Sequence, residues 1–510
     1  MKKVLSLMLV FLIIFAGCTN SDNDTNQDKN NEENNKNTII KMACTPPDTL
    51  NPLMTNHQSV YDVLFLMYDG LFKVDCDMSA KGVLAENYTS SNENTTYTIT
   101  LKDNVKFHLG KPFKSEDVIA TLDYITFFSN RYNYLKSLIK SYNSVDDKTV
   151  VINLNKSVSD FVNLLDFPIL PSGLNAEDFS LPNTTFTPNG TSMYKYEYME
   201  NRKNMYLNAN DDWFYNGEGP KIKRVNVEIM SDEETIIYAF ETSMIDILPA
   251  SFKSSYEYDF SKKGYKTYEI EDNYFTFIGL NTNSQALNNK ESRKQLKDII
   301  DKEKIIKNIL NDNAIKSDGP FRENIYFSDK VLHNIKDNES TKTPFINENT
   351  PKGENALVLL YNIDNKTHEK LALFLKHDLE SYGYKIELSA QSKSTYLERV
   401  LNCHYDIYVG EVNIPNNLDM SFMFCDNLNY GRICAFSSDE LTNLCDNLNL
   451  MINSESKNIS LGNFNKYYEE NVFQIPLYFS KSKVFVNNNI KGDLTPDASS
   501  LLNGFENLYI

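Results

Sequence analysis

Hydrophobic and polar residues follow two different rhythms along this chain, and together they predict a mixed α/β fold. Between Ser59 and Leu71 the apolar residues recur at helical spacing, which predicts a helix. Over Tyr97–Leu101 apolar and polar residues alternate, which predicts a half-buried strand. The same reading predicts a helix that Ser115 caps, with Glu116 and Asp117 in its first turn.

Further elements continue this mixture to the end of the chain. Predicted strands are Ile39–Cys44, Val150–Leu154, Val225–Met230, Phe275–Leu280, Ala356–Tyr361 and Lys385–Leu388. Predicted helices are Glu233–Thr242, Ser292–Asn311 and Thr367–Tyr382. The last strand–helix–strand unit stands apart from an earlier part richer in strands, so we expect at least two lobes.

The first residues have the layout of a secretion signal. Lys2 and Lys3 precede an apolar run, Val4–Ile14, which is too short to span a bilayer comfortably. The run ends in Phe15-Ala16-Gly17-Cys18, which resembles the lipobox of bacterial lipoproteins except at Phe15. The resemblance implies a signal peptide of residues 1–17, cleavage before Cys18 and a diacylglycerol on its sulfur; the alternative is a plain signal peptide. Two acyl chains, such as palmitate, form a stable anchor.

A polar segment follows the cysteine. Residues 19–37 contain no aliphatic or aromatic side chain, so they cannot bury apolar surface and we expect a disordered tether over 18–37. A flexible coil of this length spans roughly 25 Å.

Composition narrows the function mainly by exclusion. A formal net charge of −18 argues against nucleic acid as a partner and against lying flat on anionic lipid. No motif for hydrolysis, phosphate binding or metal chemistry is found, so we expect neither an enzyme nor a cofactor. Lysine outnumbers arginine and asparagine is common, which is typical of a low-GC bacterium. We therefore expect a lipid-anchored protein on the extracellular face of a Gram-positive cell membrane.

Six cysteines remain beyond Cys18, and none belongs to a Cys-x-x-Cys pair. Buried free thiols are the interpretation we favour, although export would allow disulfides. If a bridge exists, it joins Cys425 to Cys434 or Cys445.

Several ordered motifs resemble the family 5 extracellular solute-binding proteins, the peptide- and nickel-binding class. Their positions are Asp48–Leu53, Tyr68–Phe72, Leu84–Tyr88, Thr96–Lys102, Val105–His108, Lys111–Val118, Gly190–Tyr194, Phe240–Ile247, Ile278–Thr282 and Ile475–Tyr478. The run from Leu84 to Val118 is the most specific. Two segments depart from the family pattern: Gly190–Tyr194 lacks its proline, and Phe240–Ile247 lacks its glycine.

This resemblance implies a bilobal, periplasmic-binding-protein-like fold of class II, with three domains and a two-strand hinge that closes around a ligand. We expect domain I to comprise 38–72, 190–280 and 482–510. Domain II would be an insertion at 73–189, and domain III would span 281–481.

The resemblance also implies where a ligand binds. Peptide-binding members pair an aspartate of domain III with the α-amino group of the peptide. Alignment on Pro415 places Asn413 there, and an amide brings no charge. Glu411 or Asp419 would supply the charge from a shifted position; the alternative is that all three are solvated loop residues. Asn416 of the same loop is a further candidate ligand-binding residue.

Other candidate ligand-binding residues lie outside that loop. His57, Gln58 and Ser59 occupy the place where relatives present a strand to the peptide, although Ser59 is also a good N-cap. Tyr274 precedes the hinge strand, and Tyr430 either flanks the ligand or packs in the core.

The expected partners follow from the same resemblance. We predict a monomeric substrate-binding lipoprotein that captures oligopeptides and delivers them to the permease subunits of an ABC importer. The alternatives are a non-peptide solute, such as a nickel chelate or a sugar, and a surface receptor that senses peptides. His57 is the only histidine near the expected site, so direct metal coordination has little support.

Overall fold

The computed structural model describes residues 39–129, 131–183, 185–214, 219–249, 260, 264–322, 325, 356–425, 433–450 and 454–510, apart from the side chains of 454 and 455. The signal, Cys18, the tether and Tyr430 lie outside these described residues. Within the described ranges, no helix combines the length and the apolar character that crossing a bilayer demands.

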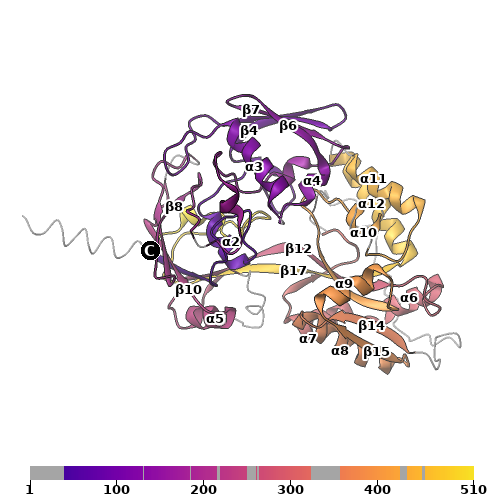
Figure 1. Cartoon of the computed structure of the whole chain (residues 1–510). Coiled ribbons are helices and arrows are strands. Elements are labelled where there is room, and N and C mark those ends of the chain that lie inside the picture. The colour runs from indigo at the N-terminus through magenta and orange to yellow at the C-terminus, as the bar shows by residue number, and fades with distance from the viewer. Residues whose placement is uncertain are drawn as a thin grey trace, which may run out of the picture.

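The first sheet joins the start of the chain to residues far along it. β1 (Ile39–Cys44) pairs in parallel with β10 (Arg224–Ile229), and β9 (Asn204–Ala209) and β8 (Tyr194–Glu200) complete the order β1-β10-β9-β8. α2 (Gln58–Phe65) buries Val60, Val63 and Leu64 beside this sheet and ends earlier than its apolar stripe predicts. α5 (Glu233–Glu241) lies at the other side, in the lower left of Figure 1.

A second sheet is antiparallel and lies in the upper part of Figure 1. Its order is β4-β5-β7-β6, from β4 (Ala85–Ser91), β5 (Thr96–Leu101), β7 (Thr149–Leu154) and β6 (Ile139–Asp146). α3 (Ser115–Phe127) and α4 (Tyr134–Leu138) accompany it.

The N-cap that the sequence predicts for α3 is wrong by one residue. Lys114 is the cap, and its backbone N–H donates to the Asp117 carboxylate at 2.9 Å. The Ser115 hydroxyl instead contacts Ser144 Oγ at 2.7 Å and the carbonyl of Asp146, because it lies inside the helix and faces β6. Ser115 therefore ties α3 to its sheet.

Two long strands connect the parts of the molecule. β12 (Lys266–Leu280) and β17 (Gln474–Val486) pair antiparallel along most of their lengths and run side by side across the centre of Figure 1. They lie within a seven-stranded sheet of order β11-β17-β12-β16-β14-β15. Its other strands are β11 (Ile247–Pro249), β13 (Ala314–Lys316, paired with β17), β14 (Leu357–Asn362), β15 (Ile386–Gln391) and β16 (Ile407–Asn413).

Helices cover the far end of this sheet. They are α6 (Lys290–Ile299), α7 (Lys302–Leu310), α8 (Lys366–Ser381), α9 (Lys393–Leu401), α10 (Ser421–Phe424), α11 (Asp439–Asn449) and α12 (Ser454–Asn471). The single helix predicted over Ser292–Asn311 is therefore wrong. Ile300 adopts an extended conformation, and the Asp301 carboxylate accepts a hydrogen bond from Lys304 N at 3.1 Å, which caps a second helix.

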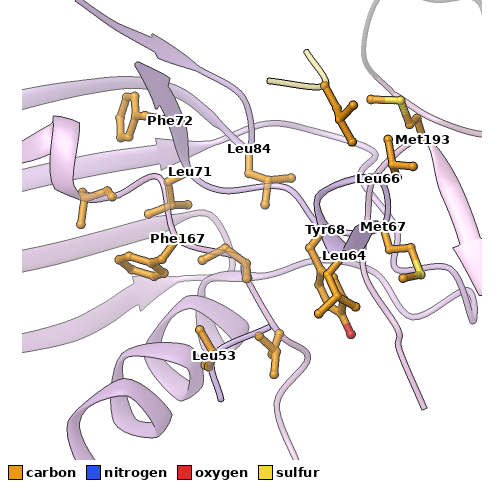
Figure 2. Packing of buried hydrophobic residues seen from close by; sticks show 14 of the residues in the cluster. Leu53, Leu64, Leu66, Met67, Tyr68, Leu71, Phe72, Leu84, Phe167 and Met193 are labelled. Atoms are coloured by element: carbon orange, nitrogen blue, oxygen red, sulfur yellow. The ribbon is translucent and has the colours of Figure 1, made fainter. Parts of the chain in front are cut away.

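The buried core consists of several clusters that the two long strands connect. Figure 2 shows part of the largest cluster, in which Leu64, Met67 and Leu71 pack with Phe167 and Leu84. β17 sends Val484 and Val486 into this cluster, Phe479 into a second one and Ile475 and Leu477 into a third. A displacement of β17 would therefore move side chains in each of these three clusters.

The positions of the sheets along the chain can be compared with the expected domain limits. β4-β5-β7-β6 is formed inside 73–189, and β14 and β15 lie inside 281–481. β17 runs across the expected limit at 481–482, because one strand serves two lobes. The domain limits themselves stay a prediction.

All six cysteines of the described chain are free thiols. Cys44, Cys425, Cys434 and Cys445 are buried, whereas Cys76 and Cys403 are only partly buried. The thiols of Cys425 and Cys445 lie within hydrogen-bonding reach of each other.

Candidate functional site

A large cleft lies between the seven-stranded sheet and the part of the chain around α2, α4 and the loop after β7. Its volume is about 820 Å³, in the range of sites that hold small molecules. Its walls come from α2, from the segment around α4, from the loop after β7, from β12, from the loop after β16 and from the C-terminal segment around Asp497. No single element forms the site, because each contributes only a few side chains.

The pairing of β12 with β16 fixes one wall of the cleft. Tyr274 lies opposite Asn413, and Thr276 lies opposite Glu411. Asp272 accepts a hydrogen bond from Tyr274 N at 2.8 Å, which holds the start of this wall. Tyr274, Glu411 and Asn413 all line the cleft, and Tyr274 is 41% exposed.

Asn416 forms hydrogen bonds that connect two lobes. Its Nδ2 donates to the Asp166 carboxylate at 3.2 Å, and its carbonyl accepts from Asn163 Nδ2 at 3.0 Å. Its Oδ1 accepts from Asn273 Nδ2 at 3.0 Å. Although Asn416 lines the cleft, these bonds occupy its amide and join the loop after β7 to the loop after β16.

Asp419 is held by its own lobe. Its Oδ1 accepts hydrogen bonds from Ser421 N at 2.9 Å and from Asn449 Nδ2 at 3.1 Å. These contacts fix the start of α10 and dock α11 against it. The carboxylate lines the cleft, but one of its oxygens is already used in these two hydrogen bonds within the lobe.

Of the three consecutive candidates near the start of α2, only Gln58 lines the cleft. His57 is the N-cap of α2 without a side-chain cap, and its Nδ1 lies 3.0 Å from the Pro46 carbonyl. Ser59 is buried and is not the N-cap; its hydroxyl accepts from Thr45 N at 3.1 Å. Ser59 thus anchors α2 to the chain after β1.

Several cleft residues were missed by sequence reasoning. Arg131 lies over the ring of Tyr61, with 4.1 Å from its Cζ to the ring centroid, and donates to Gln58 Oε1 at 3.4 Å. The Tyr61 hydroxyl in turn contacts the Tyr132 hydroxyl at 2.7 Å. These residues lie on two elements, and no local motif marks them.

Two buried carboxylates meet at the floor of the cleft. Burial raises the pKa of Asp166 to about 7, and the nearby charge of Asp497 adds to this effect. Burial likewise raises the pKa of Asp497, which is 5% exposed, to about 6. Asp497 Oδ1 accepts from the backbone N–H groups of Ser499 and Ser500, each at 3.0 Å. Near neutral pH, both groups lie close to their titration points.

The lining is strongly acidic. Its seven carboxylates are Asp62, Asp166, Glu271, Asp272, Glu411, Asp419 and Asp497, and its three cationic side chains are Arg131, Lys156 and Lys370. Both signs of charge are present, with an excess of negative charge. Among the described residues, no three His, Cys, Asp or Glu side chains are grouped so that they could hold a metal ion.

Lobes that two long strands connect, with one large cleft between them, define a bilobed ligand-binding protein. Residues 79–430 match the family described as bacterial extracellular solute-binding proteins, family 5 Middle. The chain belongs to this family, which confirms the family and the fold class predicted from the sequence motifs.

Known relatives agree with this assignment. The glutathione-binding protein GsiB of Salmonella typhimurium is 26% identical over 354 residues, 67% of this chain and 67% of that protein. The oligopeptide-binding protein AppA of Bacillus subtilis is 23% identical over 445 residues, 79% of this chain and 78% of that protein.

Solved structures share the fold. The ABC transporter substrate-binding protein CtaP from Listeria monocytogenes matches with a TM-score of 0.74 at 20% identity, covering 92% of this chain and 98% of CtaP. The structure of Bacillus subtilis AppA in complex with a nonapeptide matches with a TM-score of 0.67 at 19% identity, over 92% of this chain and 98% of that chain. Family and relatives are solute-binding components of transporters, so the chain is a substrate-binding protein and not an enzyme.

Proposed function

We propose that this protein captures oligopeptides in the cleft and delivers them to the permease of an ABC importer. The observation that carries the proposal is the cleft itself: about 820 Å³, between lobes, with charges of both signs on its walls. A free peptide is a zwitterion whose backbone carries a donor and an acceptor at almost every residue. The named ligands of the relatives, glutathione and oligopeptides, support this choice.

The cleft offers partners for the different parts of a peptide. Arg131 and Lys156 supply positive charge for a terminal carboxylate, and the guanidinium of Arg131 is already oriented by its stacking on Tyr61. Tyr274 and Asn413, which lie opposite each other in the β12–β16 ladder, offer polar side chains to a peptide backbone. Glu411, from the same wall, is the candidate partner for an α-ammonium because Asn413 carries no charge.

Delivery depends on closure of the lobes. The pair β12–β17 is the connection about which they turn, and β-strand irregularities between Glu271 and Phe275 lie at the edge of the cleft. A ligand that touches both lobes binds the closed form more tightly and shifts the equilibrium toward it. The permease then selects the closed, loaded protein.

The anchor belongs to the same proposal. Cys18 carries the lipid that keeps the protein on the outer face of the cell membrane, supported by the motif Phe15-Ala16-Gly17-Cys18. Replacing the thiol in Cys18→Ala is expected to move the protein from the membrane fraction to the medium. Retention in the membrane fraction by the variant would disprove the anchor.

The proposed ligand class is tested by identifying what the protein carries. Protein purified from its own cells is denatured, and released small molecules are identified by mass spectrometry. We expect short peptides, and calorimetry with synthetic copies should show saturable binding at one site per chain. Recovery of a metal chelate or a sugar alone would overturn the peptide assignment. Growth of a deletion strain on such a peptide as sole source of a required amino acid separates import from sensing.

A further inference from the structure

A small second cavity adjoins the cleft. Its volume is about 70 Å³, enough for several water molecules at roughly 10–15 Å³ each. Tyr61, Phe65, Asp166 and Ser499 line both this side cavity and the cleft, so the two cavities share a wall. A group that enters the cleft at this point therefore comes directly against the side cavity.

Carboxylates converge here from distant parts of the chain. Asp69 and Glu506 line the side cavity, Asp166 lines both cavities, and Asp497 lines the adjoining floor of the cleft. Lys73 is the one cationic side chain in the lining of the side cavity among the described residues, and its Nζ lies 3.8 Å from Asp497 Oδ2. Within the lining of the side cavity, three carboxylates therefore face one ammonium group, and Lys102 adds a favourable charge near Asp69.

Two of these carboxylates each have one buried oxygen without a hydrogen-bond donor. Asp497 Oδ2 and Glu506 Oε2 have no such partner among the described residues, and Asp497 is 5% exposed. Buried polar atoms are nearly always paired in folded proteins, and an unpaired one signals a missing partner. The missing partner here must be a donor, because an ionised carboxylate only accepts hydrogen bonds.

The remaining walls suit the stem of a basic side chain. Leu64, Phe65, Phe72, Pro168 and Met193 are apolar and line the side cavity next to its carboxylates. An aliphatic chain that ends in an ammonium group matches this combination of an apolar wall and an acidic end.

The raised pKa values of these carboxylates are consistent with a site that lacks a bound cation. Burial raises the pKa of Asp69 and of Asp497 to about 6, and that of Asp166 to about 7. A bound ammonium group would favour the charged forms and bring these values down.

We propose that the junction of the cleft and the side cavity is a subsite for a primary ammonium group of the bound ligand, with Asp166 and Asp497 as its direct partners. This inference rests on the proposed peptide function and makes it more specific: the protein selects peptides by positive charge at this point. The ammonium is either the tip of a lysine side chain, with the peptide's α-ammonium at Glu411, or the α-ammonium itself, which would then take that role away from Glu411.

Calorimetry at pH 7.5 with four matched peptides tests the subsite. The peptides share one sequence and carry either a free or an acetylated N-terminus and either lysine or acetyl-lysine. The proteins are wild type, Asp166→Asn, Asp497→Asn and the control Glu387→Gln, which removes a charge from the exposed side of β15, outside the cleft lining. Circular dichroism and thermal melting verify folding, and Glu506→Gln replaces any variant that does not fold.

We expect wild type and Glu387→Gln to prefer one ammonium-bearing peptide over its acetylated match by about tenfold or more. In Asp166→Asn and Asp497→Asn this preference should shrink to about threefold or less, with unchanged affinity for the doubly acetylated peptide. The favoured peptide identifies which ammonium enters the subsite. Peptides that bind regardless of charge, or a preference that survives both variants, would overturn the subsite but leave the peptide function standing. Binding of none of the four by folded wild type would overturn both.

Discussion

Lys457 on α12 and Asp160 in the loop after β7 form an ion pair across the two lobes, although 297 positions separate them in the sequence. Lys457 is only 8% exposed. Together with the bond from Asn163 to Asn416, the pair joins the loop after β7 to the lobe that holds α12 and the loop after β16. Its formation and loss should therefore accompany closing and opening.

We predict that Lys457→Met weakens ligand binding. The substitution removes the ammonium partner of Asp160, so the form in which this pair is made should lose about 1–3 kcal/mol, less than for a fully buried pair because Asp160 is partly exposed. Calorimetry should then show a correspondingly raised Kd. Small-angle scattering of the unliganded variant should show a larger radius of gyration. An unchanged Kd would mean that the pair does not contribute to closure.

A second prediction concerns the packing of the hinge strand. Gly279 lies opposite Tyr408 in the β12–β16 ladder, and a Cβ at Gly279 would overlap the Tyr408 ring. Gly279→Ala must displace this ring, whose hydroxyl donates to the Ile433 carbonyl at 2.6 Å. We expect a loss of about 1–3 kcal/mol in the free energy of unfolding, measured by denaturant titration. Gly383→Ala is the comparison variant: its added methyl group meets no atom within 4 Å, so any loss of stability there comes from the positive φ of 88° and not from a clash.

A third prediction concerns charge on the cleft wall. Asn413→Asp puts a carboxylate beside Tyr274, so a peptide with a free N-terminus should bind tighter by about 1–3 kcal/mol than in wild type, with no gain for its acetylated match. Asn402→Asp, an exposed position on α9's C-terminal side, adds the same charge elsewhere and should change neither affinity. Equal gains for both peptides would contradict an α-ammonium at this wall.

A fourth prediction uses the pH dependence of stability without ligand. The pKa of Asp166 is raised to about 7, from an ordinary value of about 4, so burial disfavours its charged form. Stability should fall as pH rises from about 4 to 7 and stay low above that, since the unfolded state loses its proton first. Asp166→Asn should therefore stabilise the unliganded protein at both pH values, by about 2–3 kcal/mol more at pH 8 than at pH 5.

Thermal melts at the two pH values measure this difference, with Glu387→Gln as the control. The charged and titratable groups that surround Asp166 in the two cavities are Tyr61, Asp62, Asp69, Lys73, Arg131, Tyr132, Tyr134, Asp497 and Glu506. A stabilisation of equal size at pH 5 and pH 8 would show that Asp166 is not the group responsible.

Much of the fold could be predicted from the sequence because its signals are local. The alternation over Tyr97–Leu101 gave β5, and the family motifs gave the overall architecture. The predicted element limits were wrong where a single residue decides whether a helix continues or ends. The break at Ile300 lies within a continuous apolar period, so the period alone could not reveal the capping role of Asp301.

The cleft was less predictable, because its residues come together only in three dimensions. Alignment around Pro415 led to Glu411 and Asn413, which do line the cleft, whereas their role toward a ligand stays a prediction. Asp166 and Asp497 carry no motif, and their burial becomes visible only once β17 and the loop after β7 are in place. Ser59 looked like a cap because its hydroxyl partner, Thr45, belongs to another element.

The path of β17 has a consequence for how the protein matures. Residues 474–486 belong to the seven-stranded sheet and supply side chains to several of the cores, and Ser499 Oγ accepts a hydrogen bond from Val74 N at 2.7 Å. During synthesis, neither lobe can reach its final packing until this late segment has been made. The order of the chain therefore delays the locking of both lobes until the last long strand is available.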